Sequence, residues 1–211
     1  MNREHIAAKV LGISTSPRLK GNSDLLLREA LAGAESAGAQ AEYLRIGDLN
    51  IAPCVECNAC YSTGRCRVQD DYQQVLQKML DADRLIFATP VFFMTVCAQA
   101  KILIDRGQCL WANKHVLKKP LFENGPRDRR ALVIAVGGSR STKQFEGIRL
   151  TMKSYFDMLE IKYIANLFVN KVDARGAIKQ HPSALKEAFR LGKELVTIAT
   201  PPDKPVDVHL T

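Results

Sequence analysis

The chain has 211 residues, of which 46% are hydrophobic and 25% charged, and this size and composition predict one folded domain whose core needs no cross-links. No apolar run reaches the ~20 residues of a membrane span, and the charged start MNREH is not followed by a cleavage site, so we expect a cytoplasmic protein with reduced cysteines and no membrane partner. The net charge of +8 comes from scattered basic residues without interleaved aromatic side chains, a pattern that argues against a nucleic-acid partner.

Short apolar segments alternate with segments of helical periodicity along the chain. In chain order the sequence predicts strand 6–14, helix 22–37, strand 41–46, helix 72–80, strand 84–89, helix 96–106, strand 131–136, helix 144–159, strand 162–169 and helix 183–199. This alternation indicates an α/β, flavodoxin-like, doubly wound fold with five parallel strands in the order 2-1-3-4-5. We expect a single domain over residues 1–199, a cysteine-rich loop 54–66 inserted after the second strand, and an extended C-terminal tail over residues 200–211.

The first loop at the expected ligand-binding edge, residues 14–24 (STSPRLKGNSD), precedes the first helix. It lacks the G-x-G-x-x-G spacing of a dinucleotide site and the G-K-[ST] ending of a P-loop. It offers hydroxyl, amide and guanidinium donors from Ser14, Thr15, Ser16, Arg18, Asn22 and Ser23. Because these donors stand beside a helix N-terminus, we favour a phosphate-monoester site over a solvated turn.

Two further loops leave strands at the same edge of the predicted sheet. Residues 89–95 (TPVFFMT) carry Phe92, Phe93 and Met94, which either pack into the core or lie exposed until a planar apolar group covers them. Residues 137–141 (GGSRS) carry Gly137 and Gly138, which permit a close approach of the backbone to a ligand.

Four of the six cysteines, Cys54, Cys57, Cys60 and Cys66, follow the spacing C-x2-C-x2-C-x5-C. Such compact spacing is typical of a [4Fe–4S] site, because a short loop can wrap three thiolates around one face of a cluster. Structural zinc prefers two separated ligand pairs, and the sequence has no second pair. We therefore favour the cluster, with thiols that hold no metal, zinc, or redox disulfides as alternatives.

The set SPRLKGNSD, C-x2-C-x2-C-x5-C-x3-DD, TPVFFMTVCAQAKILIDR and GGSR occurs in this order over most of residues 8–160. As a set it resembles the flavodoxin-like NAD(P)H-dependent FMN reductase superfamily and, within it, the iron-sulfur flavoprotein family. The resemblance implies FMN and a [4Fe–4S] cluster as cofactors. It implies FMN phosphate at Ser16, Arg18, Asn22 and Ser23, the isoalloxazine ring against Pro90, Val91, Phe92, Phe93 and Met94, and the other side of the ring closed by Gly137, Gly138 and Arg140.

This reading predicts an electron-transfer oxidoreductase that couples FMN to the cluster, with no catalytic acid or base among its side chains. The family implies one-electron partners and a homodimer or homotetramer. The basic charge would suit an acidic, ferredoxin-like carrier, and NAD(P)H is the other expected donor. Two alternatives stay open: an NAD(P)H-dependent FMN or quinone reductase without a cluster, and a non-enzymatic redox sensor or zinc-stabilised binding module.

Overall fold

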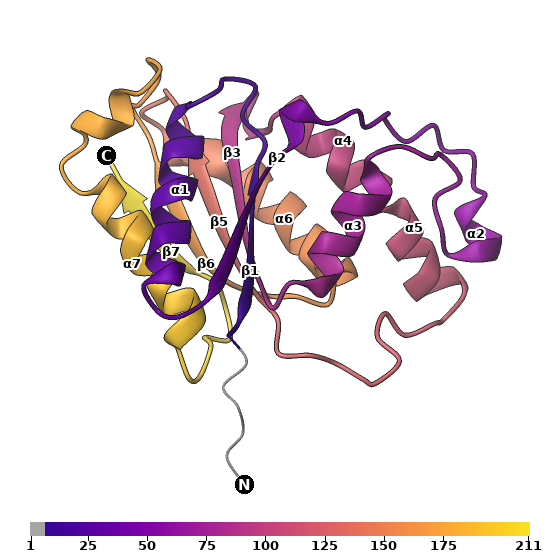
Figure 1. Ribbon diagram of the computed structural model, residues 1–211. Coiled ribbons are helices and arrows are strands. Elements are labelled where there is room, and N and C mark those ends of the chain that lie inside the picture. The colour runs from indigo at the N-terminus through magenta and orange to yellow at the C-terminus, as the bar shows by residue number, and fades with distance from the viewer. Residues whose placement is uncertain (1–6) are drawn as a thin grey trace, which may run out of the picture.

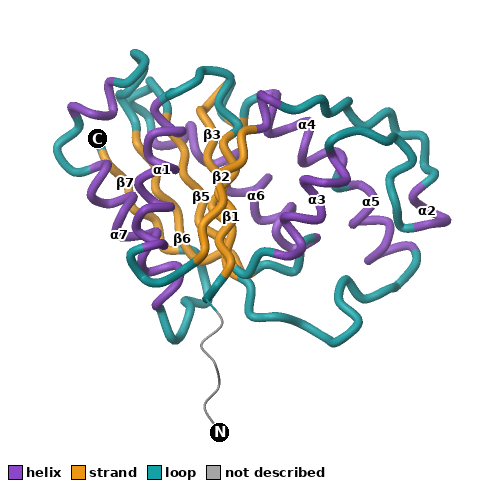
Figure 2. Tube along the Cα trace, viewed as in Figure 1, coloured by secondary structure: helices purple, strands orange, loops and turns teal. Residues whose placement is uncertain are grey.

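A twisted, mostly parallel sheet runs through the middle of the molecule, and helices cover both of its faces (Figure 1; Figure 2). The computed structural model describes residues 7–211, so Ile6, the first residue of the first predicted strand, lies outside the described part. The strands are β1 Lys9–Ser14, β2 Gln40–Arg45, β3 Arg84–Phe92, β4 Thr95–Val96, β5 Arg130–Val136, β6 Lys162–Val169 and β7 Val206–Leu210. Their order is β2-β1-β3-β5-β6-β7, with β4 antiparallel to β3.

The helices divide between the two faces of the sheet. The α-helices are α1 Asn22–Glu35, α2 Cys60–Thr63, α3 Tyr72–Asp81, α4 Ala98–Arg106, α5 Gln108–Trp111, α6 Glu146–Met158 and α7 Ala184–Thr197. Short 3-10 turns η1 Ile46–Asp48, η3 Thr142–Phe145 and η4 Ala177–Gln180 and a π-helical turn η2 Ala112–Val116 complete the chain. One apolar core joins α1 and α7 to the sheet, and a second joins α3, α4 and α6 to its other face.

The flavodoxin-like α/β class is confirmed, but the expected number of strands is wrong, because the sheet has seven strands rather than five. The five expected strands keep their order as β2-β1-β3-β5-β6. The two additional strands are β4, which is only two residues long, and β7, which pairs in parallel with β6. The prolines before β7 suggested a tail outside the sheet, but an edge strand tolerates flanking prolines, and the alternation VDVHL has the period of a strand.

Three buried arginines, Arg84, Arg129 and Arg130, cap helices instead of forming an open basic surface. Arg129 is 2% exposed and donates hydrogen bonds to three backbone carbonyls around the C-terminal ends of α3 and α6, including Leu159 O at 2.5 Å. Arg84 and Arg130 bind carbonyls at the end of α7 in the same way. Burial, followed by the charge of Arg127, lowers the pKa of Arg129 to about 10. These side chains satisfy helix-end carbonyls that otherwise lack partners.

Among residues 7–211, no helix has the length and apolar character needed to cross a membrane.

Candidate functional site

A cavity lies at the carboxyl ends of β1, β3, β5 and β6, the edge at which doubly wound sheets bind their ligands. Four loops meet there, and their lining residues are Ser16, Pro17, Arg18, Gly21, Asn22, Ser23, Pro90, Val91, Phe92, Val136, Gly137, Gly138, Val172 and Asp173. The structure therefore brings the three loops singled out in the sequence to one cavity. Of the residues predicted to bind the cofactor, four do not line it: Ser14, Phe93, Met94 and Arg140.

The loop after β1 ends in an open helix N-terminus that faces the cavity. Gly21 is the N-cap of α1 and supplies no side-chain cap, and Asn22 and Ser23 are the first helical residues. The free N–H groups of this first turn suit an anion. Ser16 Oγ accepts from Arg18 N at 3.2 Å, and a Cβ on Gly21 would come within 2.7 Å of that oxygen. Glycine is therefore needed for the loop to fold this tightly.

Asn22 holds a neighbouring loop with both ends of its amide. Its Nδ2 donates to Ala174 O at 3.0 Å, and its Oδ1 accepts from Ile178 N at 3.2 Å. Arg18 Nη1 donates to Asp173 O at 3.1 Å. These three bonds tie the loop after β1 to the loop after β6, so Asn22 supports the cavity wall through its side chain. Its contact with a phosphate remains a prediction.

Three residues at or behind the cavity were not predicted from the sequence: Arg45, Val172 and Asp173. Arg45 ends β2 opposite Ser14 in the register, and its Nη2 donates to Pro17 O at 3.1 Å. This hydrogen bond holds the backbone of the loop after β1 against the end of β2. Ser14 is fully buried and does not line the cavity. The sequence feature that could have indicated Arg45 is a basic residue at the end of the strand expected beside the first strand. The loop after β6 carries no motif that could have indicated Val172 and Asp173.

The loop after β3 is a tight hairpin with an aromatic tip. Val91 pairs with Val96 and Phe92 with Thr95, which leaves Phe93 and Met94 as a two-residue turn. Both have positive φ, +47° and +64°, a conformation that usually requires glycine or asparagine. Phe93 is fully exposed and Phe92 and Met94 are about half exposed, so none packs into the core as the alternative required. Phe92 lines the cavity, and the strained tip stands beside it.

The loop after β5 forms the opposite wall. A Cβ on Gly137 would lie 2.1 Å from Gln144 Oε1, and one on Gly138 would lie 3.1 Å from the Asp173 Cβ. The two glycines therefore let this loop pack closely against Gln144 and Asp173, and their close approach to a ligand stays a prediction. Arg140 is exposed and contributes its carbonyl, which accepts a hydrogen bond from Asn170.

The cysteine segment follows β2 and η1 and reaches the edge of the molecule at α2 (Figure 1). Cys57 is exposed, Cys54 and Cys66 are half-buried, and Cys60 is buried at the start of α2. Burial raises the pKa of the Cys60 thiol, and neighbouring Cys109, Cys66 and Cys54 add to the rise.

The residues between these thiols support a site for an anionic centre. Glu56 and Asn58 have φ of +51° and +56°, so the sign of φ alternates from Val55 to Ala59, as it does in the N–H concavities of many anion and iron–sulfur sites. No three His, Cys, Asp or Glu side chains within the described chain converge as a metal-binding group. Four cysteine thiols are the donors that an iron–sulfur cluster takes, but here they are not gathered around one point.

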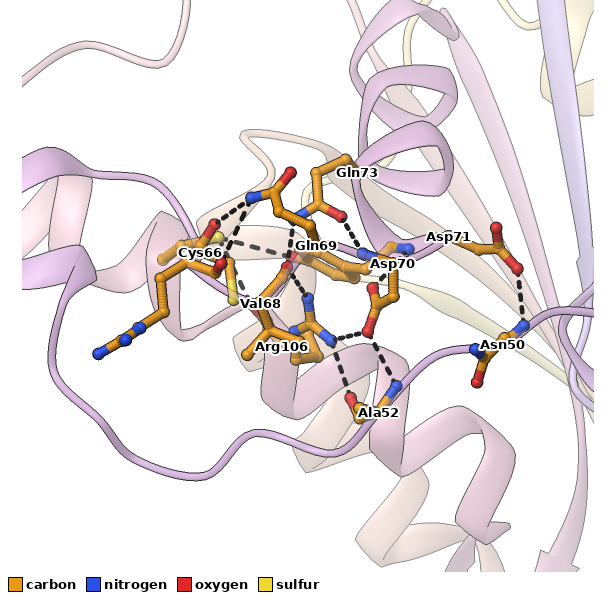
Figure 3. A network of polar contacts seen from close by, with 12 residues as sticks. Asn50, Ala52, Cys66, Val68, Gln69, Asp70, Asp71, Gln73 and Arg106 are labelled. Atoms are coloured by element: carbon orange, nitrogen blue, oxygen red, sulfur yellow. Dashed lines mark hydrogen bonds and ion pairs between the residues drawn. The ribbon is translucent and has the colours of Figure 1, made fainter.

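A buried polar network joins the two ends of this segment (Figure 3). Asp70 Oδ2 accepts from Ala52 N at 3.0 Å and from Arg106 Nη1 at 2.6 Å. Asp71 Oδ2 accepts from Asn50 N at 2.7 Å. The two consecutive aspartates therefore close the segment into a loop whose ends lie side by side.

Comparison with known sequences gives two kinds of match. The sequence model of the NADPH-dependent FMN reductase family matches residues 8–174. An iron-sulfur flavoprotein of Methanocaldococcus jannaschii is 38% identical over 64% of this chain and 65% of its own length, so the matched part is just under two thirds of that relative. An iron-sulfur flavoprotein of Methanosarcina thermophila is 32% identical over 72% of this chain and 73% of its own.

Among solved structures, the NAD(P)H:quinone oxidoreductase of Methanothermobacter marburgensis superposes with a TM-score of 0.64 at 19% identity, covering 90% of this chain and 97% of that one. At this identity the likeness concerns the fold alone.

Proposed function

The chain belongs to the NADPH-dependent FMN reductase family, together with relatives named iron-sulfur flavoproteins, and from this membership we propose that it is an electron-transfer flavoprotein coupling FMN to a [4Fe–4S] cluster. The family makes it a flavin-dependent oxidoreductase. The observation that carries the proposal is the cavity where the loops after β1, β3, β5 and β6 meet, because ligands of doubly wound sheets bind at this switch point.

The residues at the two ends of this cavity have the chemistry that would suit the phosphate and the ring of FMN. The uncapped first turn of α1, with the hydroxyls of Ser16 and Ser23 and the charge of Arg18, would hold the phosphate. Pro90, Val91 and Phe92 would lie against the ring, with Phe93 and Met94 of the hairpin tip at its edge. Gly137 and Gly138 would close the opposite side, and Arg140 would act from the rim.

Cys54, Cys57, Cys60 and Cys66 would hold the cluster. Support comes from their compact spacing, from the alternating backbone around Glu56 and Asn58, and from the names of the relatives. Bound FMN supplies two-electron or one-electron chemistry, and an iron–sulfur centre passes one electron at a time. The protein's part is to hold the two at fixed places and to exclude water from the cavity.

A homodimer or homotetramer is part of the proposal. In Figure 1 the cysteine segment around α2 lies at the edge of the molecule, away from the carboxyl ends of β1 and β3. A segment at the edge of the molecule is accessible to a second chain of such an assembly. A ferredoxin-like acidic carrier or NAD(P)H would exchange electrons with the assembly, in keeping with the net charge of +8. All six cysteines are free, which suits a reducing cytoplasm.

The test is an anaerobic visible spectrum with iron and acid-labile sulfide analysis of the purified, reconstituted protein. We expect one FMN and about four iron and four sulfide per chain. Cys54→Ser should lose iron and sulfide but keep the flavin, while Cys97→Ser, a buried thiol outside the segment, should keep both. Flavin without iron or sulfide in the unmodified protein overturns the cluster.

A second candidate is an NAD(P)H-dependent FMN or quinone reductase without a cluster. The observation that favours it is that the four thiols do not converge in the described chain. It predicts steady-state NAD(P)H oxidation with a quinone that Cys54→Ser leaves unchanged. Family membership argues against the third alternative, a non-enzymatic redox sensor or zinc-stabilised binding module, which would be colourless even when FMN is offered.

A further inference from the structure

A second cavity lies between α3, the segment formed by α5 and η2, and the chain that runs from η2 to β5. It shares no lining residue with the cavity at the switch point. In Figure 1 the chain after α5 passes below α3 on its way back to the sheet. Residues 117–129 of this connection contain no helix or strand. Connections of such length without secondary structure are uncommon in compact domains, and most of them have a function.

The walls of this cavity are held in place by backbone and side-chain contacts. At the start of the connection Lys119 N donates to Asn113 O at 3.0 Å, and near its end Arg127 Nη1 donates to Leu80 O at 3.0 Å. Gly64, the left-handed C-cap of α2, packs against η2, because a Cβ there would lie 2.7 Å from Asn113 Oδ1. The cavity is therefore formed without a ligand, as most small-molecule sites are.

Much of the lining is apolar. Leu76 and Leu80 of α3, Leu110 of α5 and Leu121 of the connection all line the cavity. Leu110 is buried and the other three are only partly buried, so apolar surface remains open to the cavity. A ligand with an apolar body would remove this surface from water, which is favourable.

The charged residues of the lining are Arg65, Lys119 and Glu123. All three are exposed, and none of them takes part in an ion pair among residues 7–211. Two cations and one anion give the lining an excess of positive charge. The cavity thus combines cations that have no counter-charge with an apolar surface, and the two together suit an organic anion.

We propose that this cavity is a second binding site, which takes an organic anion with an apolar body. Arg65 and Lys119 bind the anionic group, and the four leucines contact the body. The inference goes beyond the proposed function, because it requires neither FMN nor a metal centre. The competing explanation is that the scattered positive charge of the whole surface attracts any anion.

The test is equilibrium dialysis of the full-length protein with anilinonaphthalene sulfonate, an anion with an apolar ring system. Phenylnaphthylamine, which has the same rings without the sulfonate, is the uncharged companion probe. We expect the sulfonate to bind at a single site per chain. Its affinity should be the same with and without FMN, since the two cavities have no lining residue in common.

Charge variants locate the probe. Arg65→Gln and Lys119→Gln should each weaken binding of the sulfonate about threefold to fivefold, and Glu123→Gln should strengthen it. Binding of the uncharged probe should change by less than about twofold in these three variants. Arg67→Gln and Lys118→Gln are the matched controls and should leave both affinities unchanged, because these exposed basic residues belong to the same two segments but do not line the cavity.

Leu121→Ala tests the apolar part of the site. It removes apolar contact and should weaken binding of both probes, and urea unfolding checks that the variant is folded. Unchanged affinities in folded Leu121→Ala protein would show that the probes bind elsewhere.

Three results overturn the site. They are the absence of saturable binding of the sulfonate, its displacement by FMN, which would place the probe in the switch-point cavity, and equal effects of the lining and control variants, which would indicate general surface charge. A protein that takes up no flavin would overturn the proposed function but not this site, because dialysis without FMN still reports on it.

Discussion

The guanidinium of Arg18 donates to the backbone oxygen of Asp173 at 3.1 Å, which joins the loop after β1 to the loop after β6 across 155 residues of sequence. Asn22 adds two bonds to the same loop, with Ala174 O and Ile178 N. The cavity at the switch point is therefore closed by side chains from the loop that is expected to bind phosphate. Retention of the flavin should depend on this wall as well as on direct contacts.

Asn22→Ala should weaken FMN binding up to about thirtyfold, because two hydrogen bonds of roughly 1 kcal/mol each hold the loop after β6. Flavin fluorescence quenching during titration of the apoprotein measures the dissociation constant. Asn50→Ala is the control, since Asn50 is exposed and is held through its backbone N–H. Equal affinities of the two variants would contradict this role of Asn22.

Sequence patterns were sufficient to place the strands that are buried along most of their length. The strand over residues 162–169 was placed to the residue, because β6 is apolar along most of its length. The pattern failed at β7, where prolines 201, 202 and 205 outweighed a short alternation. An edge strand pairs with only one neighbouring strand. Its pairing with β6 depends on tertiary packing, which local propensity does not encode.

The residues of the candidate site also divide into those that the sequence predicts and those that it does not. Loops that follow strands could be assigned to one edge of the sheet by topology, so Ser16, Ser23 and Gly137 were expected at the cavity and line it. Arg45 and Asp173 were not, because their contacts depend on side-chain direction and on a loop without a motif. The same limit hid the pairing of Asp70 with Arg106, which lie 36 residues apart in the sequence.

Close packing between α1 and α7 should make Gly192 intolerant of a side chain. A Cβ there would lie 1.8 Å from Ala30 O, a backbone atom that cannot move independently. Gly192→Ala should lower the free energy of unfolding by about 2–3 kcal/mol through overpacking. Urea unfolding measures it, and the neighbouring exposed Lys193→Ala should change it by less than about 0.5 kcal/mol. A stable Gly192→Ala protein would mean that the helices can separate at low cost.

The hairpin tip should be strained at Met94. Its φ of +64° is unfavourable for a residue with a Cβ, and glycine adopts it freely. Met94→Gly should therefore raise the free energy of unfolding by about 0.5–1 kcal/mol, while Met94→Ala keeps the strain and should not. Comparison of the two urea midpoints checks this expectation. If glycine is no more stable than alanine, the turn is not strained in solution.

The acid stability of the protein should depend on Asp70. Burial raises the pKa of its carboxyl, but hydrogen bonds from Arg106 and from the N–H groups of Ala52 and Tyr72 hold the pKa below its ordinary value of 3.8. A carboxyl whose pKa is lower in the folded than in the unfolded state stabilises the fold fully above the unfolded pKa. That contribution is lost as the pH falls through the folded pKa.

The difference in free energy of unfolding between the unmodified protein and Asp70→Asn should therefore be constant above about pH 5 and shrink below about pH 4. Urea unfolding at a series of pH values measures this difference. Removing one partner of a buried pair should cost about 3 kcal/mol at neutral pH, because Arg106 remains buried without its counter-charge. Asp157→Asn, on an exposed pair with Lys153, should cost less than about 1 kcal/mol. A difference that keeps its neutral-pH size in acid would show that Asp70 acts on stability without its charge.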